Sequence, residues 1–112
     1  MATGTLPTQF AETVSITPVS SVIAYGHKIG CVRTGKVVQI TFWENQALST
    51  NGIAITDVPK AKTNATAVIT KGGASSYETL GTVFIQAGET NVYILCKSTN
   101  TPLYGELVYI CE

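Results

Sequence analysis

Charge is scarce in this chain, and so are the side chains on which most catalytic and metal sites depend. Charged residues make up 12% of the 112 residues, about half of the roughly 25% usual in soluble domains. There is one histidine, and no cluster of metal-ligating side chains surrounds it in the sequence. A phosphate-binding glycine loop, a nucleophile elbow and carboxylates paired at catalytic spacing are also missing. The sequence therefore predicts no metal, no cofactor and no enzymatic activity, and a function carried out by surfaces.

Neither sign of charge forms a run. The seven basic and seven acidic residues cancel, whereas nucleic-acid binders concentrate Lys and Arg on one face. The first residues lack the basic and apolar regions of a signal peptide, and no apolar run has the length that spans a bilayer. We expect no nucleic-acid partner, no membrane insertion and no signal peptide.

Charge is low and the mean hydropathy is +0.24, so a monomer of this chain would leave apolar surface exposed to solvent. Val92–Leu95 and Leu107–Ile110 carry apolar residues on both faces of their expected strands. One face of such a strand fills the core of its own subunit, and the other needs a partner. The composition predicts that copies of the chain associate with one another.

The three cysteines lie on strand-like segments and are odd in number. A disulfide framework uses an even number in a secreted chain. We therefore expect buried, reduced thiols at Cys31, Cys96 and Cys111.

Short apolar runs separated by turn residues fill the chain from residue 12 onward. No window carries the 3.6-residue period of a helix, and we count about eight to ten short strands at the spacing of a sandwich or barrel. Residues 1–11 are rich in Thr, Gly, Pro and Gln and are expected to be a linker. The prediction is an all-β domain over residues 12–112, an antiparallel β-sandwich or jelly roll.

The strongest local signals are two hairpins. One covers residues 28–43 with a turn at Thr34–Gly35, and the other covers residues 82–96. In the second arm of the first hairpin, alternate residues share a face. The set predicted for the core is Val38, Ile40 and Phe42, and the set predicted for a subunit contact is Val37, Gln39, Thr41 and Trp43.

Weaker signals predict further strands. Residues 13–17 alternate and should form a strand ended by Pro18, which cannot donate to a ladder. Asn51–Gly52 is expected to be a turn joining residues 47–48 to 53–55. Residues 65–70 form another strand-like run.

Three aromatic residues lie beside amides or carboxylates, a setting that suits a saccharide, because a ring stacks on sugar C–H faces while polar groups take the hydroxyls. The loops concerned are residues 43–46, 57–62, 72–77 and 98–104, which a sandwich gathers at its ends. The candidate ligand-binding residues are Trp43, Asn45, Asp57, Tyr77, Asn100 and Tyr104. Each of the three aromatic residues, taken singly, could instead be an anchor in the core or in a subunit interface. Asp57 could instead cap a turn with its side chain. Tyr25, Tyr93 and Tyr109 lie inside apolar strands and are assigned to structure.

Three segments resemble the head domains of phage tail fibres and receptor-binding proteins. Residues 28–42 are similar to the opening hairpin of those heads, residues 55–60 to the segment before their central loop, and residues 81–94 to their late hairpin. The final strand ends one residue before the last residue given, as in those fibres. The similarity covers residues 20 to 112, with Val58 where the family usually has Leu.

The resemblance implies a small β-sandwich that trimerises about a fibre axis, with residues 1–11 as a fibre-shaft remnant. It also implies a non-enzymatic adhesin at a fibre tip, on the virion or outside the cell, that binds host cell-surface glycan and touches other virion or fibre proteins. No binding residue carries over from the family. Two alternatives stay open: a purely structural virion or baseplate module, and a trimeric ligand domain of the tumour-necrosis-factor or complement-head type.

Overall fold

The computed structural model describes residues 11–19, 22, 28–44, 51–71, 78–96 and 103–112. These residues form nine strands and no helix, and the strands pair antiparallel throughout. The all-β, antiparallel prediction is confirmed. Across the same ranges no helix has the length and apolar character that crosses a membrane.

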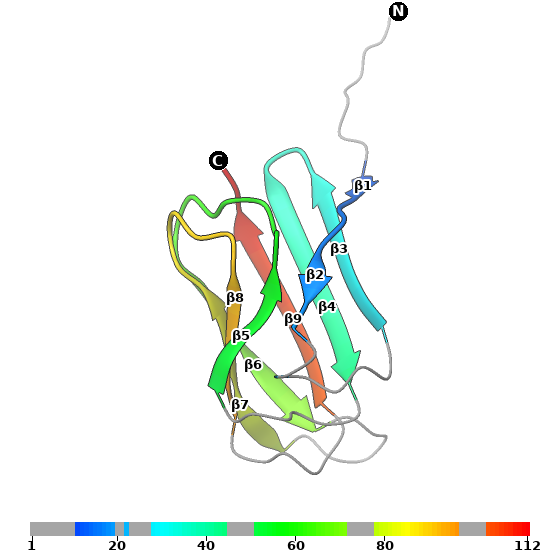
Figure 1. Ribbon diagram of the computed structural model, residues 1–112, viewed down its shortest axis with the longest axis vertical. Coiled ribbons are helices and arrows are strands. Elements are labelled where there is room, and N and C mark those ends of the chain that lie inside the picture. Colours follow the sequence, from blue (N-terminus) through cyan, green and yellow to red (C-terminus); the bar gives the residue numbers. More distant parts are fainter. Residues whose placement is uncertain (1–10, 20–21, 23–27, 45–50, 72–77, 97–102) are drawn as a thin grey trace, which may run out of the picture.

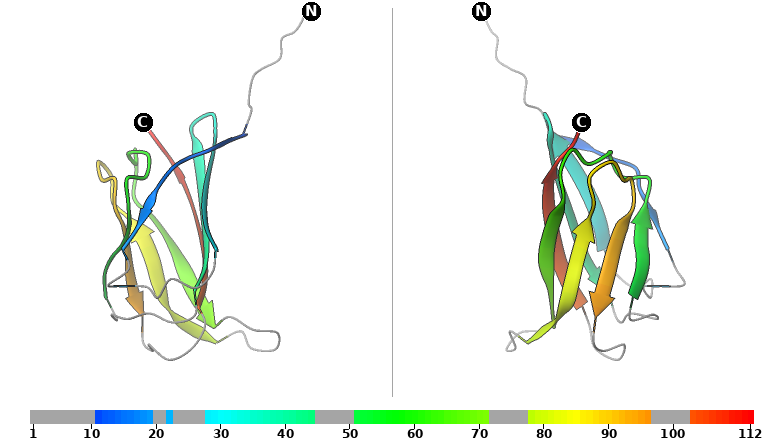
Figure 2. Two further views of the ribbon diagram at one scale, coloured as in Figure 1. Left: turned by 45° about the vertical axis from the view of Figure 1, so that its right-hand side comes forward. Right: turned by 90° about the vertical axis from the view of Figure 1, so that its left-hand side faces the viewer.

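All nine strands belong to one sheet with the order β1-β3-β4-β9-β6-β7-β8-β5-β2. The sheet curls until β3, β4 and β9 face β7, β8 and β5 across the interior, which gives the two layers of a sandwich (Figure 1, Figure 2). The strands are β1 (Ala11–Thr13), β2 (Thr17–Pro18), β3 (Lys28–Thr34), β4 (Val37–Glu44), β5 (Asn51–Thr56), β6 (Ala65–Lys71), β7 (Thr79–Ile85), β8 (Val92–Cys96) and β9 (Leu103–Ile110).

The core lies between the two layers and is filled by alternate residues of each strand. In β4 the side chains of Val38, Ile40 and Phe42 are buried, as the sequence predicts. In β9 burial alternates at every residue from Leu103 to Ile110. Each of these strands therefore sends one set of side chains into the core and leaves the other set on the outer face.

Both predicted hairpins are present. In β3–β4, Thr34 still pairs with Val37, so the two-residue turn is Gly35–Lys36, one residue later than predicted. Gly35 has a φ of 63°, which explains the glycine at that position. β7 pairs with β8 from Gly81 to Phe84, which confirms the second hairpin.

The strand predicted over residues 13–17 is instead split in two. β1 pairs with β3 at one edge of the sheet, and β2 pairs with β5 at the other edge. Residues 11–19, the N-terminal strap, thus cross the opening between the two sheet edges, and Pro18 is the last residue of β2, where it pairs with Ile55. An edge strand tolerates Pro18 because only one of its sides has to pair.

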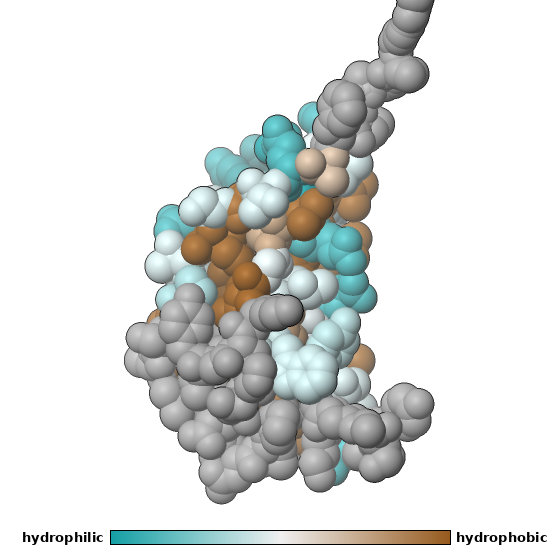
Figure 3. All heavy atoms as spheres, turned by 90° about the vertical axis from the view of Figure 1, so that its right-hand side faces the viewer, coloured by the Kyte–Doolittle hydropathy of each residue, from teal (hydrophilic) through white to brown (hydrophobic). Residues whose placement is uncertain are grey.

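The inward-facing side chains of the strap pack against the core. Val14, Ile16 and Val19 are partly buried and pack against it. Figure 3 faces the right-hand side of Figure 1, and apolar (brown) atoms remain visible in the middle of that side. The core residues beneath are at most 8% exposed, so the visible apolar atoms are those of partly buried side chains around them.

Asn51–Gly52 is not the turn that the sequence predicts. Both residues lie in β5, where Asn51 pairs with Leu95 and Gly52 with Ile94. Gly52 has a φ of 144°, a conformation that glycine allows within a strand. Pairing with β8, distant in the sequence, overrides the local turn signal.

The three cysteines are buried and none of them forms a disulfide bond, as predicted. Burial raises the pKa of Cys31 to about 11, so its thiol stays protonated at neutral pH. The cysteines therefore act as small apolar core residues.

Candidate binding surface

Exposed apolar side chains gather on one face of the molecule. The described residues include eight large apolar side chains that are exposed. Six of them lie on the outer face of β3, β4 and β9, while Val68 and Leu95 lie on β6 and β8 with Thr82 of β7 between them. The six are Val32, Val37, Trp43, Tyr104, Val108 and Ile110.

Two of the six form an aromatic pair, Trp43 and Tyr104. The register of β4 and β9 sets them directly opposite each other, and their ring centroids lie 6.2 Å apart at an interplanar angle of 81°. This edge-to-face geometry is favourable for two rings. Trp43 is 44% exposed and Tyr104 is 40% exposed, so the pair lies on the surface and is not a core anchor.

Hydroxyl and carboxylate groups border the aromatic pair. Thr70 of β6 pairs with Tyr104, and Thr41 and Glu106 form the next cross-strand pair along β4 and β9. The pair thus has hydrogen-bonding neighbours from three strands. The sequence reasoning missed Thr70 and Glu106, because their partners across the sheet are distant in the chain.

A polar belt crosses the same face above the aromatic pair. The Gln39 amide donates to the Glu106 carboxylate, and Thr41 lies opposite Glu106. The aliphatic patch, which consists of Val32, Val37, Val108 and Ile110, surrounds Gln39 on three sides. The outer face is therefore divided into an aromatic end and an aliphatic end.

The rows of the aliphatic patch follow from the register. Val37 lies opposite Ile110, and Gln39 lies between Val32 and Val108 on the neighbouring strands. The four side chains are 37–53% exposed. The sequence signal for this patch is the presence of apolar residues on both faces of the strands, and it identifies Val37 and Leu107–Ile110.

Asp57 does not join the aromatic pair, and the single patch expected from four loops is wrong in this respect. β5 runs toward the upper end of Figure 1, where Asp57 follows it, whereas β4 ends and β9 begins at the lower end. The carboxylate of Asp57 accepts hydrogen bonds from the hydroxyls of Thr17 (2.7 Å) and Thr56 (3.4 Å). Asp57 thus anchors the N-terminal strap to β5.

The rest of residues 57–62 closes the upper end of the core. Val58 and Ala61 are buried. The backbone of this segment bonds to Thr90, Glu89, Gly88, Ile110 and Glu112. Tyr109 of β9 also donates its hydroxyl to the Pro59 carbonyl (2.7 Å). These contacts give the segment a structural role, which the polar, Pro-containing sequence does not reveal.

Asn45, Tyr77 and Asn100 lie outside the described residues. The strand ends that border them do lie close together, because Glu44 pairs with Leu103 and Leu103 pairs with Lys71. Those strand ends lie at the same end of the sandwich as the aromatic pair.

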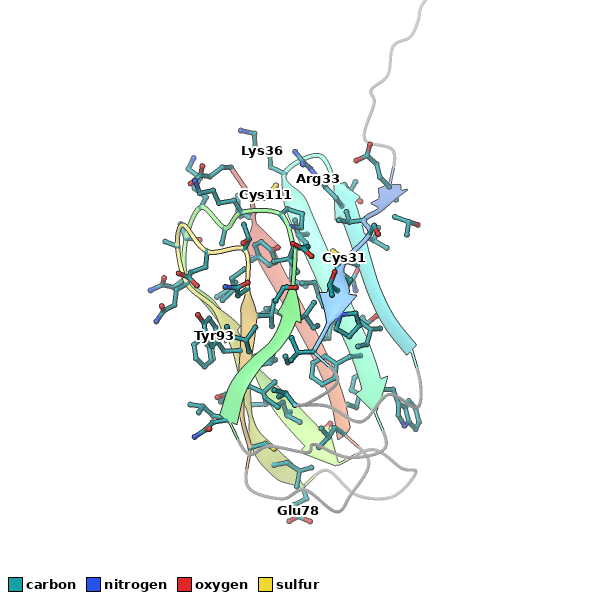
Figure 4. The ribbon with its side chains drawn as sticks, viewed as in Figure 1. Cys31, Arg33, Lys36, Glu78, Tyr93 and Cys111 are labelled. Carbon is teal, nitrogen blue, oxygen red and sulfur yellow. The ribbon has the colours of Figure 1, made fainter. Side chains whose placement is uncertain are left out.

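The outer face of the second layer carries its own ring contact. Phe84 and Tyr93 stack with centroids 5.3 Å apart, and Tyr93 points away from the core (Figure 4). The hydroxyl of Tyr93 donates to Glu89 (3.0 Å), and this bond raises the pKa of Tyr93. Both rings are partly buried, so they offer less open surface than the aromatic pair.

The described part of the chain holds no group of three His, Cys, Asp or Glu side chains that could bind a metal ion. Comparison with protein-family models, curated proteins and solved structures gives no match. The resemblance to phage fibre heads thus stays a prediction from the sequence.

Proposed function

We propose that this protein is a non-enzymatic attachment domain that binds cell-surface saccharide through the aromatic pair. The observation that carries the proposal is the exposed, edge-to-face placement of Trp43 and Tyr104 on adjacent strands. Exposed rings of this kind stack on the C–H faces of sugars. The resemblance of residues 28–42 and 81–94 to fibre heads supports a place at the tip of a phage tail fibre or a similar fibre.

The groups around the rings suit a sugar ligand. A pyranose lying on one ring is bordered by the edge of the other ring. The hydroxyls of Thr41 and Thr70 and the carboxylate of Glu106 lie on neighbouring positions of the same face, and they match the hydroxyl groups of a sugar.

A single shallow site of this kind binds weakly, because an exposed sugar keeps much of its hydration. Three copies on a trimer, and several fibres on one virion, raise the strength of attachment through effective concentration. The number three comes from the family resemblance. The proposed partners are copies of this chain, a host glycan and other virion or fibre proteins.

A second candidate is a structural virion or baseplate module that contacts only protein. The aliphatic patch favours it, since branched aliphatic side chains offer a sugar neither a stacking ring nor a hydrogen bond. The two candidates differ in what the aromatic pair does.

Trp43 is the only tryptophan of the chain, so intrinsic fluorescence reports on the proposed site directly. We expect a saturable change in Trp43 emission when the full chain is titrated with a panel of bacterial surface saccharides. The substitution Tyr104→Ala removes the second ring and should weaken the response at least about tenfold.

Leu95→Ala is the matched control, because Leu95 is exposed on the opposite layer, and it should leave the titration unchanged. Emission that stays constant over the whole panel, while labelled protein still binds cells, would contradict the site. If Trp43→Ala or Tyr104→Ala unfolds the protein, the rings serve stability and the assignment fails.

A further inference from the structure

We infer that the aliphatic patch is the contact surface between copies of this chain, and that the polar belt leaves the aromatic pair outside that contact. This inference rests on the proposed association of copies and names the surface through which it occurs. On this inference, the aliphatic end of the sheet face binds another copy of the chain, and the aromatic end binds saccharide.

The patch has the character of an interface centre. Val32, Val37, Val108 and Ile110 are all β-branched and lose little rotamer freedom when they are covered. They stand on three adjacent strands of one layer around Gln39, which pairs with both Val32 and Val108, so the patch is a rigid apolar frame with one amide in it. Covering each side chain removes apolar area from water and stabilises the contact.

The surroundings of the patch have the character of a rim. Thr41 and Glu106 border it toward the aromatic pair, and Gln39 donates its amide from inside the patch to Glu106. Lys36 and Glu112 lie beyond its other end, where the backbone of Cys111 bonds to Lys36, and Figure 4 shows Lys36 and Cys111 there. Protein interfaces combine an uncharged apolar centre with a polar rim in this way.

The charges favour a second copy as the occupant. The four patch residues are uncharged, and the charged residues that flank them are of both signs: Lys36, Lys62, Glu106 and Glu112. Identical surfaces can therefore meet without accumulating like charge, and a Lys36 of one copy can approach a carboxylate of the other. The zero net charge of the chain adds no long-range repulsion between copies.

The polar belt fixes where the contact stops. Gln39 and Glu106 satisfy each other with a hydrogen bond, and burying Glu106 at the centre of an interface would cost free energy. The contact therefore covers Gln39 and ends at Thr41 and Glu106, and Trp43 and Tyr104 stay accessible in the assembled state.

The test is the mass of the full chain in solution, measured by light scattering at about 100 μM protein. We expect a multiple of 11.8 kDa for the wild type. Val37→Lys and Val108→Lys place a charge in the patch and should each yield the 11.8 kDa monomer. Val68→Lys and Leu95→Lys are matched controls on equally exposed residues away from the patch, and they should stay assembled.

Circular dichroism distinguishes dissociation from unfolding. Because Val108 is 53% exposed, Val108→Lys should keep the wild-type spectrum. A monomeric wild type, patch variants that stay assembled, or control variants that also dissociate would each overturn the inference. The sugar titration of Trp43 should be unchanged in Val108→Lys. Assembly without sugar binding would therefore refute the proposed function and leave this inference standing, and sugar binding by a monomer would do the reverse.

Discussion

At the scale of single residues, two glycines mark where neighbouring strands leave no room for a side chain. A Cβ atom on Gly81 would lie 1.9 Å from the carbonyl oxygen of Leu95. A Cβ atom on Gly105 would lie 2.5 Å from the ring of Phe42, its cross-strand neighbour. The Leu95 carbonyl is a backbone group and cannot rotate away from an added Cβ atom, whereas the Phe42 ring is a side chain that can shift.

Gly81→Ala should therefore lower the free energy of unfolding by at least about 3 kcal/mol. Gly30→Ala is the matched control, because its Cβ would meet only the Thr41 hydroxyl at an ordinary 3.6 Å; it should be neutral or slightly stabilising. Urea denaturation of the two variants measures the difference. Equal stability of Gly81→Ala and Gly30→Ala would show that β7 and β8 do not approach as closely as described.

Residue-level prediction from the sequence succeeds where alternation is the whole signal. Val38, Ile40 and Phe42 are recognised as core residues because period 2 leaves them no other face. Asp57 is grouped with the aromatic rings in the sequence because nothing local shows that its partner is the hydroxyl of Thr17, forty positions earlier. Its positive φ of 64° marks a turn that the chain requires before residues 58–62 can close the core.

At the scale of elements, the N-terminal strap is the piece that decides whether the sandwich is closed. β1 is exposed along its length, and β2 has two residues. The strap is therefore held by few backbone bonds, by the partial burial of Val14, Ile16 and Val19, and by the bond between Thr17 and Asp57.

A double-mutant cycle with Thr17→Val and Asp57→Gly should give a coupling free energy of about 1 kcal/mol. Glycine is chosen because it adopts the positive φ at residue 57 without strain. Thermal or urea unfolding of the two single variants and the double variant supplies the measurement. Strictly additive effects would mean that the hydroxyl–carboxylate bond does not hold the strap.

Elements whose partner is next in the sequence could be predicted, and elements with distant partners could not. The hairpins β3–β4 and β7–β8 follow from turn residues between alternating arms. The strap pairs with β3 and β5, and β5 pairs with β8, so the local pattern could show neither the division of residues 13–17 between two strands nor the strand at Asn51–Gly52. In both segments, loop closure and pairing with a strand distant in the sequence determine the observed structure.

At the scale of the whole molecule, function is assigned to one outer face with two ends. The sequence identifies the apolar character of both strand faces, and it identifies Trp43 and Tyr104 separately. It could not bring the two rings together, because they are 61 positions apart and meet only through the pairing of β4 with β9. Nor could it separate Asp57 from them, since nothing local tells which end of a sandwich a loop occupies.

Substitutions at the aromatic end and at the aliphatic end of this face should weaken attachment to cells in different ways. Tyr104→Ala should remove the binding of each site while copies stay associated. Val108→Lys should leave each site intact and lose only the gain that comes from several sites binding together.

The most direct test is the binding of fluorescently labelled full-length chain to a panel of whole bacterial cells, compared for the wild type, Tyr104→Ala and Val108→Lys. We expect the wild type to bind at least one strain. We expect Tyr104→Ala not to bind although its mass and melting temperature match those of the wild type, and we expect Val108→Lys to bind more weakly than the wild type. Binding of Tyr104→Ala at the wild-type level would contradict the account.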